Sequence, residues 1–215
     1  MAKKTLSQQR WLKRQKNDIY VKKAHQEGYR SRAAYKLKEI QEKYHLIKKG
    51  DFILDLGAAP GSWSQVALEL GAKVKGIDLL PVMPLEGAVF LEGDFRTFFG
   101  SCQIGDQGSD QGRDQGNDEK SALYEGILSD ISPSTCGIPK VDHLKLVGML
   151  EEILDIFLSQ LKVQGFFVCK VFKGGMQNDL LAMLKKHFKK ISHFKPKSSR
   201  PESPEEYLIA QGYQP

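Results

Sequence analysis

The segment Asp51–Gln65, which reads DFILDLGAAPGSWSQ, constrains the fold of this chain more than any other segment. An apolar run ends at Asp55, and a loop of small residues containing Gly57 and Gly61 then leads into a helix-like pattern. A strand, a tight glycine turn and a helix start in this order are typical of sheets that bind a nucleotide-like ligand at the carboxyl ends of their strands. Glycine removes the side chain where the backbone must come close to such a ligand.

The residues around this turn indicate which kind of nucleotide would fit. The next apolar run, Val74–Leu80, carries Asp78, whose carboxylate could accept hydrogen bonds from both hydroxyls of a ribose. The dinucleotide fingerprint G-x-G-x-x-G needs three glycines, but Ala59 and Ser62 stand at the second and third positions. No lysine follows the turn as in a phosphate-binding loop. A nucleoside cofactor such as S-adenosylmethionine therefore suits the site better than NAD, and an ordinary strand–helix turn is the alternative.

Strand-like and helix-like segments alternate along the rest of the chain. The expected strands are Phe52–Leu56, Val74–Asp78, Ala88–Leu91, Gly126–Ile131, Phe166–Phe172, Ile191–Phe194 and Tyr207–Ala210. The expected helices are Ser31–Leu46 with Ser31 as its N-cap, Ser62–Leu70, Val141–Leu161 and Gln177–Phe188. Strands separated by helices favour an α/β fold with a mostly parallel sheet of seven strands and helices on both faces. The last strands are close in sequence, so a return strand there could be antiparallel.

Positive charge is concentrated at the beginning of the chain. The first fifty residues hold 15 Lys or Arg and 4 Asp or Glu, and the remainder holds 17 and 22, which together give the net charge of +6. A second basic cluster runs from Lys185 to Arg200. These clusters predict a polyanionic partner such as RNA or DNA, and a solvated helix face is the alternative for either one. We expect residues 1–30 to form a basic RNA-binding extension and residues 31–215 to form one domain.

The segment 100–122 differs from the rest of the chain because it contains GDQGSDQGRDQGND and has almost no apolar residue. Such a composition cannot bury enough surface to offset the entropy of ordering, and it predicts a disordered or mobile loop. A calcium-binding repeat is the alternative, but the acids lack the EF-hand spacing and its terminal bidentate glutamate.

Composition also argues against several protein classes. No apolar run approaches the ~18 residues of a membrane span, and the N-terminus lacks the apolar stretch of a secretory signal. Cys102, Cys136 and Cys169 are far apart, and the five histidines show no metal-ligand spacing. We therefore expect a reduced, cytoplasmic protein with no metal site.

Two residues could carry chemistry at the ends of predicted strands. Asp130 lies at the carboxyl end of the fourth strand, on the side of the sheet where ligands bind. Lys170 interrupts the strongly apolar fifth strand, either as a strand-end lysine that reaches solvent or as an amine in a dry cleft. In a dry cleft, burial and a nearby cation favour the neutral amine, which can take a proton from a hydroxyl. Lys36 and Glu205 are unremarkable alone, and Glu206 could replace Glu205 in any argument from spacing.

A series of short motifs runs along nearly the whole chain. They are RWL at Arg10–Leu12, YV at Tyr20–Val21, GYRSRAAYKL at Gly28–Leu37, DLGAAPGSWSQ at Asp55–Gln65, DLLP at Asp78–Pro81, GDFR at Gly93–Arg96, SDISP at Ser129–Pro133, KVF at Lys170–Phe172 and KPKSSR…EEY from Lys195 to Tyr207. In this order they closely resemble the FtsJ (RrmJ) family of ribose 2′-O-methyltransferases, which act on large-subunit ribosomal RNA.

The resemblance implies a Rossmann-like, S-adenosylmethionine-dependent methyltransferase fold and a set of site residues. The implied catalytic tetrad is Lys36, Asp130, Lys170 and Glu205. Together with Gly57 of the glycine turn, the residues expected to contact S-adenosylmethionine are Gly61, Trp63, Asp78, Asp94 and Asp130. Asp78 would bind the ribose hydroxyls and Asp94 would face the adenine amino group. The implied substrate is a uridine in the A-loop of 23S ribosomal RNA in the large subunit, methylated by a monomeric enzyme.

Three features depart from the family pattern. Ser62 replaces the family's usual second glycine after the proline, Ser134 stands where relatives often carry asparagine, and the segment 100–122 is an insertion. None removes a tetrad residue. The alternatives are 2′-O-methylation of transfer RNA or capped RNA, and a non-catalytic RNA-binding factor for ribosome assembly. An NAD-dependent reductase is disfavoured because the third glycine is absent.

Overall fold

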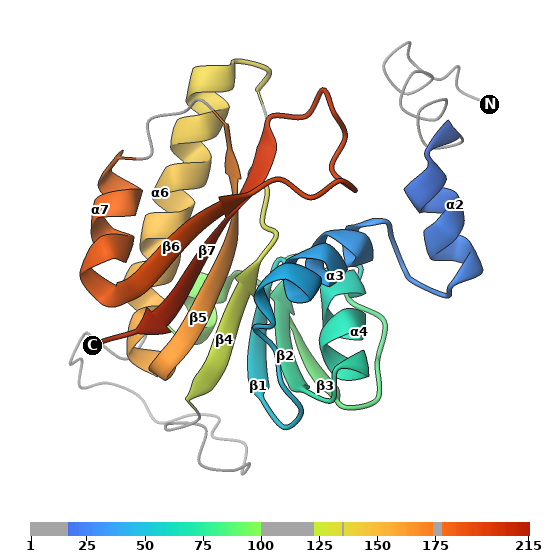
Figure 1. The fold of residues 1–215 in the computed structure, drawn as a ribbon, viewed down its shortest axis with the longest axis horizontal. Helices are drawn as coiled ribbons and strands as arrows, with labels where there is room; N and C mark the ends of the chain where they lie inside the picture. The colour runs from blue at the N-terminus through green and yellow to red at the C-terminus, as the bar shows by residue number, and fades with distance from the viewer. Residues whose placement is uncertain (1–16, 100–122, 135, 174–177) are drawn as a thin grey trace, which may run out of the picture.

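The computed structural model describes residues 17–99, 123–134, 136–173 and 178–215. Residues 1–16 of the predicted basic extension, which contain the RWL motif, and the polar segment 100–122 lie outside the described residues. The described part is built around one sheet, which Figure 1 shows with helices packed on its two faces.

The sheet has seven strands in the order β3-β2-β1-β4-β5-β7-β6. Their bounds are β1 Phe52–Leu56, β2 Lys73–Asp78, β3 Ala88–Glu92, β4 Tyr124–Ser129, β5 Leu161–Phe172, β6 Phe188–Phe194 and β7 Glu205–Tyr213. β7 lies between β5 and β6 and is antiparallel to both, whereas the pairings among β1 to β5 are parallel. The predicted mostly parallel sheet of seven strands is confirmed, and the antiparallel return strand is β7.

Helices cover both faces of the sheet because its strands are apolar on both sides. The helices are α2 Ile19–Gln26, α3 Ala33–Tyr44, α4 Ser62–Glu69, α5 Phe95–Phe99, α6 Pro139–Phe157 and α7 Asn178–His187. Successive residues of a strand point to opposite faces, and on β1 Ile53 packs in the core beneath α3 and α4 while Leu54 packs in the core beneath α6 and α7. Figure 1 shows these two helix pairs on opposite sides of the sheet.

Four local features of the structure differ from the sequence predictions. The N-cap of α3 is Arg32 rather than Ser31, although the Ser31 Oγ still accepts a hydrogen bond from the Ala33 N–H at 3.2 Å. α3 also ends at Tyr44, because His45 adopts a left-handed conformation with φ 49°. Helix α5 was not predicted, since five residues are too few to display a helical period. The predicted helix to Leu161 is shorter in the structure, and β5 begins at Leu161.

The fold provides a ligand site where the connections leave the sheet in opposite directions. β1 lies between β2 and β4, so the loops that follow β1 and β4 diverge from neighbouring strands. Such a switch point forms a crevice outside the carboxyl ends of the strands in open α/β sheets. Asp55, Asp78 and Asp130 all lie at or just beyond these strand ends.

Candidate active site

The four predicted catalytic residues lie in two lysine–carboxylate pairs at the carboxyl edge of the sheet. The Lys36 Nζ is 2.7 Å from the Glu205 Oε1. The Lys170 Nζ donates to the Asp130 backbone carbonyl at 2.7 Å and lies 3.3 Å from the Asp130 Oδ1. The side chains of Lys36 and Glu205 are 12% and 15% exposed, and those of Lys170 and Asp130 are 7% and 19% exposed. All four groups are therefore enclosed, and each charge faces an opposite charge.

Strand register brings these residues together from distant parts of the chain. Lys170 on β5 lies opposite Tyr207 on β7, and Glu205 lies opposite Phe172, two positions further along. Asp130 directly follows β4, which pairs with β5 on its other side. Lys36 comes from the first turns of α3, which packs over this face of the sheet.

Tyr207 connects the two pairs and was missed by the sequence analysis. Its hydroxyl donates to the Asp130 Oδ1 at 2.8 Å, and the Lys36 Nζ lies 5.8 Å from its ring centroid. The ring is fully buried and packs against Trp63, with 5.5 Å between the ring centroids. Burial and the carboxylates of Asp130 and Glu205 raise the pKa of Tyr207 well above its ordinary value, so the hydroxyl remains a donor. The register opposite Lys170 could have identified Tyr207, but only with the β5–β7 pairing known.

Asp130 remains charged despite its surroundings. Burial acts to raise the pKa of this carboxyl, but the ammonium groups of Lys170 and Lys36 and the Tyr207 hydroxyl outweigh burial. The pKa of Asp130 is therefore held below its usual range, and the carboxylate can hold Lys170 in one place.

The glycine turn after β1 packs closely against the neighbouring strands. Gly57 has φ 77°, and a Cβ there would lie 2.7 Å from the Ile131 Cγ1, so only glycine fits. The N–H groups of Gly57 and Ala58 both donate to the Ile77 carbonyl at the end of β2. The Asp78 carboxylate accepts from the Ala59 N–H at 2.9 Å and from the Leu80 N–H at 2.8 Å, one bond at each oxygen. Each oxygen keeps acceptor capacity for a ribose hydroxyl.

Gly61 is a glycine for a reason that the sequence analysis did not anticipate. Its φ is 105°, and the space a Cβ would take is filled by the Arg30 guanidinium. The Arg30 Nη1 donates to the carbonyls of Pro60 and Met83 at 2.9 and 2.7 Å, and Nη2 donates to that of Pro84 at 2.9 Å. Arg30 thus joins the glycine turn to the loop after β2. Next to it, the departure Ser62 forms a hydroxyl–hydroxyl bond of 2.8 Å with Ser31.

Trp63 and Asp94 have protein partners at the positions predicted for cofactor contact. The Trp63 indole N–H donates to the Ala33 carbonyl at 2.9 Å, and the side chain is buried. The Asp94 carboxylate accepts from the Arg96 backbone N–H at 3.0 Å and from its guanidinium at 2.9 Å, and that guanidinium also binds Glu152. The buried tryptophan side chain therefore contacts α3 and Tyr207. The Asp94 carboxylate keeps part of its capacity to accept hydrogen bonds.

A further carboxyl group, Asp55, is buried beneath the glycine turn. Its Oδ2 accepts from the Ser64 hydroxyl at 2.7 Å, and its Oδ1 has no hydrogen-bond partner among the described residues. Burial, with smaller contributions from Asp130 and Asp78, raises the pKa of Asp55 to about 7. The sequence analysis treated Asp55 only as the end of a strand.

The residues around the turn fit a nucleoside cofactor that carries an amino-acid group. Asp78 offers acceptors for ribose hydroxyls at the end of β2. Helix α4 begins directly after the turn, and its N-cap Gly61 has no side chain to cap the first N–H groups, which suits a carboxylate ligand. In the described parts of the chain, no three His, Cys, Asp or Glu side chains are grouped so that they could hold a metal ion.

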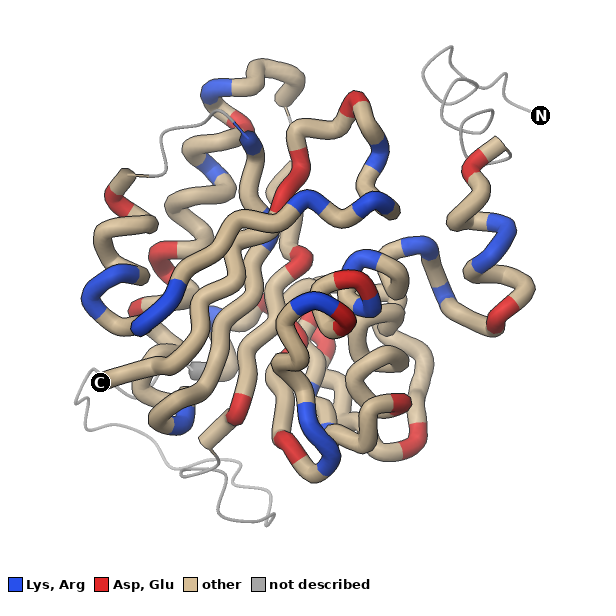
Figure 2. Tube along the Cα trace, viewed as in Figure 1, with Lys and Arg blue, Asp and Glu red and all other residues tan. Residues whose placement is uncertain are grey.

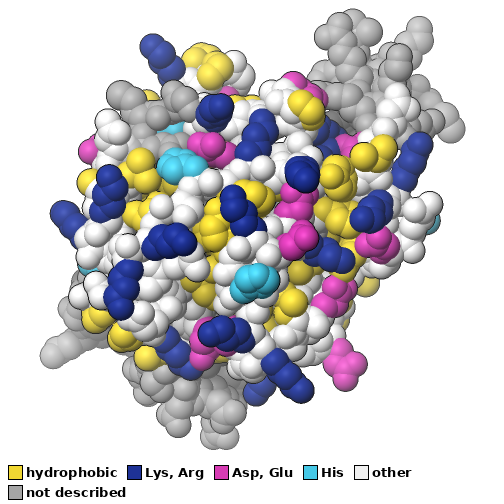
Figure 3. Space-filling model, in the orientation of Figure 1, with side chains coloured by type: hydrophobic (Ala, Val, Ile, Leu, Met, Phe, Trp, Pro, Cys, Tyr) yellow, Lys and Arg dark blue, Asp and Glu magenta, His cyan; other side chains and the backbone are white. Residues whose placement is uncertain are grey.

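Basic residues that are clustered in the sequence do not all lie together in the structure, and some of them are paired with acids. Asp18 pairs with the guanidinium groups of Arg32 and Arg200. β6 pairs with β7 so that Phe194 lies opposite Tyr207, at the end of the strands that carries the candidate site. Phe188 lies opposite Tyr213, at the other end of the strands. The cluster from Lys185 to Arg200 is thus divided between these two ends, as the separated blue segments in Figure 2 show. Figure 3 shows Lys and Arg side chains spread over the face formed by α7 and β6.

Two further predictions concern the chain as a whole. Cys136 and Cys169 are free thiols, and Cys102 lies outside the described residues. None of the described helices has the length and apolar character needed to span a membrane.

Comparison with known proteins gives consistent results. A family model described as FtsJ-like methyltransferase matches residues 29–213. A protein named ribosomal RNA large subunit methyltransferase E, from Gluconobacter oxydans, is 44% identical over 213 residues, which cover 99% of this chain and 75% of that protein. The protein of the same name from Novosphingobium aromaticivorans is 45% identical, with 98% and 90% covered. A crystal structure titled as a ribosomal RNA methyltransferase from Plasmodium falciparum has a TM-score of 0.68 at 30% identity, covering 86% of this chain and 98% of that one.

Proposed function

The chain belongs to the FtsJ-like methyltransferase family, and from this premise we propose that it methylates a ribose 2′-hydroxyl of large-subunit ribosomal RNA. The observation that carries the proposal is the convergence of Lys36, Asp130, Lys170 and Glu205 beside the glycine turn. The names of relatives that match nearly the whole of this chain support this substrate class over transfer RNA or capped RNA. By the same resemblance, the target is a uridine in the A-loop of 23S ribosomal RNA.

S-adenosylmethionine, when bound, supplies an electrophilic methyl group. The cofactor would be held by backbone near Gly57 and Gly61, with Asp78 on the ribose and Asp94 on the adenine. Asp130 would lie near the sulfonium, where its negative charge is favourable. Trp63 would act mainly by fixing the position of Tyr207 and the start of α4.

The 2′-hydroxyl is a poor nucleophile until its proton begins to leave. In the structure Lys170 is paired with Asp130 as an ammonium, so it would first have to give up its own proton; as the neutral amine it would then take the proton of the 2′-hydroxyl as general base. Asp130 would hold Lys170 in position through its carbonyl and carboxylate. Lys36 and Glu205 would position the target ribose. Alignment of reacting groups can contribute about 7–11 kcal/mol, and a general base typically contributes about 10²–10⁴-fold in rate.

RNA would be held mainly through its phosphates, so binding should weaken steeply with salt. Residues 1–30 would act as the RNA-binding extension, and the exposed Lys197 on the β6–β7 loop would assist next to the active site. A monomer acting in the cytoplasm is the simplest form of this proposal.

The proposal is tested by methyl transfer from labelled S-adenosylmethionine to unmodified large ribosomal subunits, free ribosomal RNA and transfer RNA. The modified fragment is mapped by nuclease digestion and mass spectrometry. We expect one 2′-O-methyl group in large-subunit RNA. Modification of transfer RNA alone would reassign the substrate. Cofactor binding without transfer to any of these RNAs would favour a non-catalytic ribosome-assembly factor.

A further inference from the structure

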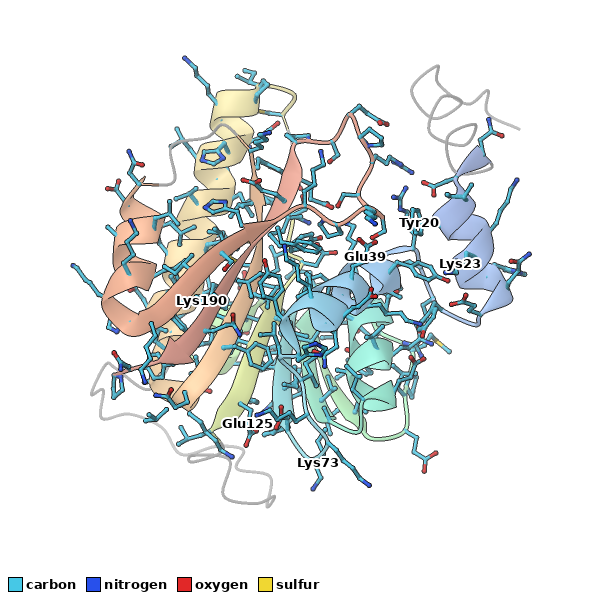
Figure 4. All side chains as sticks on the ribbon, viewed as in Figure 1. Tyr20, Lys23, Glu39, Lys73, Glu125 and Lys190 are labelled. Carbon is cyan, nitrogen blue, oxygen red and sulfur yellow. The ribbon has the colours of Figure 1, made fainter. Side chains whose placement is uncertain are left out.

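The loop between β6 and β7, residues 195–204, leads directly into Glu205 and is held from outside by α3. The Glu39 carboxylate on α3 accepts hydrogen bonds from the backbone N–H groups of Lys197 and Ser198, at 2.5 and 2.8 Å. The Arg32 guanidinium donates to the Ser198 carbonyl. Figure 4 shows Glu39 on α3 close to this loop. Both anchors act on the backbone at 197–198, so they fix the neighbouring Ser199 in place.

Contacts within the loop fix its other half. The Lys195 Nζ donates to the carbonyls of Pro201 and Ser203, at 3.2 and 2.8 Å. Arg200 pairs with Asp18 at the start of α2. The charges of Lys195 and Arg200 are thus used to hold this loop, although the sequence had assigned them to RNA.

Ser199 is the point where the loop meets the tetrad. Its hydroxyl donates to the Glu205 Oε1 at 2.9 Å, and the same oxygen lies 2.7 Å from the Lys36 Nζ. The Ser199 side chain is buried, so water does not readily replace this donor. With Ser199 present, the carboxylate oxygen that faces Lys36 has two donors at fixed positions, and its rotation is restricted.

The adjacent serine provides a natural comparison. Ser198 is also buried, but its hydroxyl has no hydrogen-bond partner in the part of the chain that the structure describes. The two residues have the same side chain, lie in the same loop and have nearly the same burial, but among the described residues only the Ser199 hydroxyl has a hydrogen bond to the tetrad.

We propose that Ser199 is a positioning residue for the methyl transfer, which acts by orienting Glu205 and through it Lys36. The inference rests on the proposed function, because these two residues would position the target ribose. Losing the hydroxyl should lower kcat and leave the KM for S-adenosylmethionine unchanged, because the cofactor side of the site keeps its contacts.

The test compares Ser199→Ala with Ser198→Ala in the full chain, using methyl transfer to large ribosomal subunits. Rates are expressed per cofactor-binding site, counted by titration with S-adenosylhomocysteine, so a misfolded fraction does not enter kcat. We expect a kcat about tenfold lower for Ser199→Ala, and a kcat equal to that of the unmodified chain for Ser198→Ala. If Ser199→Ala folds poorly, Ser199→Cys takes its place in the comparison. Cysteine nearly keeps the volume of serine but is a weak donor, so its kcat should also be about tenfold lower.

A double-mutant cycle separates positioning from a general structural role. In a Glu205→Ala background, Ser199→Ala should cause no further loss of kcat. Equal rates for the two serine variants, or a full tenfold loss in the Glu205→Ala background, would overturn the inference and leave the proposed function intact. An unmodified chain that transfers no methyl group to RNA would overturn the proposed function and the positioning role together.

Discussion

Two carboxyl groups at the same edge of the sheet, Asp55 on β1 and Asp130 after β4, are in opposite electrostatic states. Both are enclosed, with exposed fractions of 1% for Asp55 and 19% for the Asp130 side chain. Burial raises the pKa of Asp55 to about 7. Burial also acts to raise the pKa of Asp130, but Lys170, Lys36 and Tyr207 hold it below the usual range.

The difference shows that partners, more than burial, decide whether a carboxyl group in this fold is charged. The donors that act on the Asp55 pKa are neutral, the Ser64 hydroxyl and the Ser64 backbone N–H, and no cation is among the groups that shift it. Asp130 has two ammonium groups and a hydroxyl. The charged carboxylate, Asp130, lies in the proposed catalytic tetrad. Asp55, which keeps its proton up to about pH 7, lies beneath the glycine turn that is proposed to hold the cofactor.

The largest expected effect on the difference between Asp55 and Asp130 comes from removing the cation next to Asp130. Lys170→Met keeps an unbranched side chain but deletes the proposed base and the nearest ammonium group of Asp130. We expect turnover to fall about 10³-fold, within the usual contribution of a general base, and the pKa of Asp130 to rise toward that of Asp55. Turnover is measured by methyl transfer to RNA, and cofactor binding is measured separately by calorimetry.

Lys190→Met is the matched control for this variant. Lys190 is an exposed lysine on β6, near the other edge of the sheet, and is labelled in Figure 4. Its substitution should leave turnover at saturating RNA unchanged. Near-normal turnover of Lys170→Met would show that Lys170 is not the base.

The second prediction concerns Asp55 and the pH dependence of stability. Because the pKa of Asp55 is higher in the folded chain than in the unfolded chain, the folded state binds more protons between about pH 4 and pH 7. The contribution of this group to stability therefore falls as pH rises through that window, by up to about 4 kcal/mol. An asparagine cannot ionise, so Asp55→Asn should remove this part of the pH dependence.

The measurement is the free energy of unfolding in urea at pH 5 and pH 8, without cofactor, for both proteins. The buried amide of the variant adds a cost that does not change with pH, so the informative quantity is the change between the two pH values. The variant should lose less stability than the unmodified chain on going to pH 8. Parallel pH curves for the two proteins would mean that Asp55 titrates normally.

The sequence predicted the strands and placed the candidate site residues at their carboxyl ends, because apolar runs and glycine turns are local signals. Spacing alone could not choose between Glu205 and Glu206, since that choice depends on strand register, and only the family resemblance implied Glu205. In the structure Glu205 contacts Lys36, whereas Glu206 contacts His193 at 3.3 Å. Adjacent residues of a strand point to opposite faces, so the pairing of β7 with β5 and β6 decides which glutamate enters the site.

Long-range contacts also explain the residues that sequence reasoning missed. Tyr207 reads as one more apolar residue of a buried strand, and its hydroxyl has a role only because Asp130 lies next to it. Arg30 reads as one of many basic residues, but its guanidinium binds three backbone carbonyls of two loops. A count of charges cannot separate a cation that holds loops together from one that faces solvent.

The smallest expected effects come from removing the single hydroxyl that donates to each carboxyl group. Tyr207→Phe deletes the donor to Asp130, and Ser64→Ala deletes the donor to Asp55. Hydrogen bonds to charged groups contribute about 1.5–3 kcal/mol and neutral ones about 1 kcal/mol. At pH 6 Asp130 is charged and Asp55 is largely protonated, so Tyr207→Phe should lower the free energy of unfolding more than Ser64→Ala does. At pH 8 Asp55 is charged, and the cost of Ser64→Ala should increase while that of Tyr207→Phe stays constant. If the cost of Ser64→Ala is the same at pH 6 and pH 8 and equals that of Tyr207→Phe, the assignment of opposite charge states to Asp55 and Asp130 is contradicted.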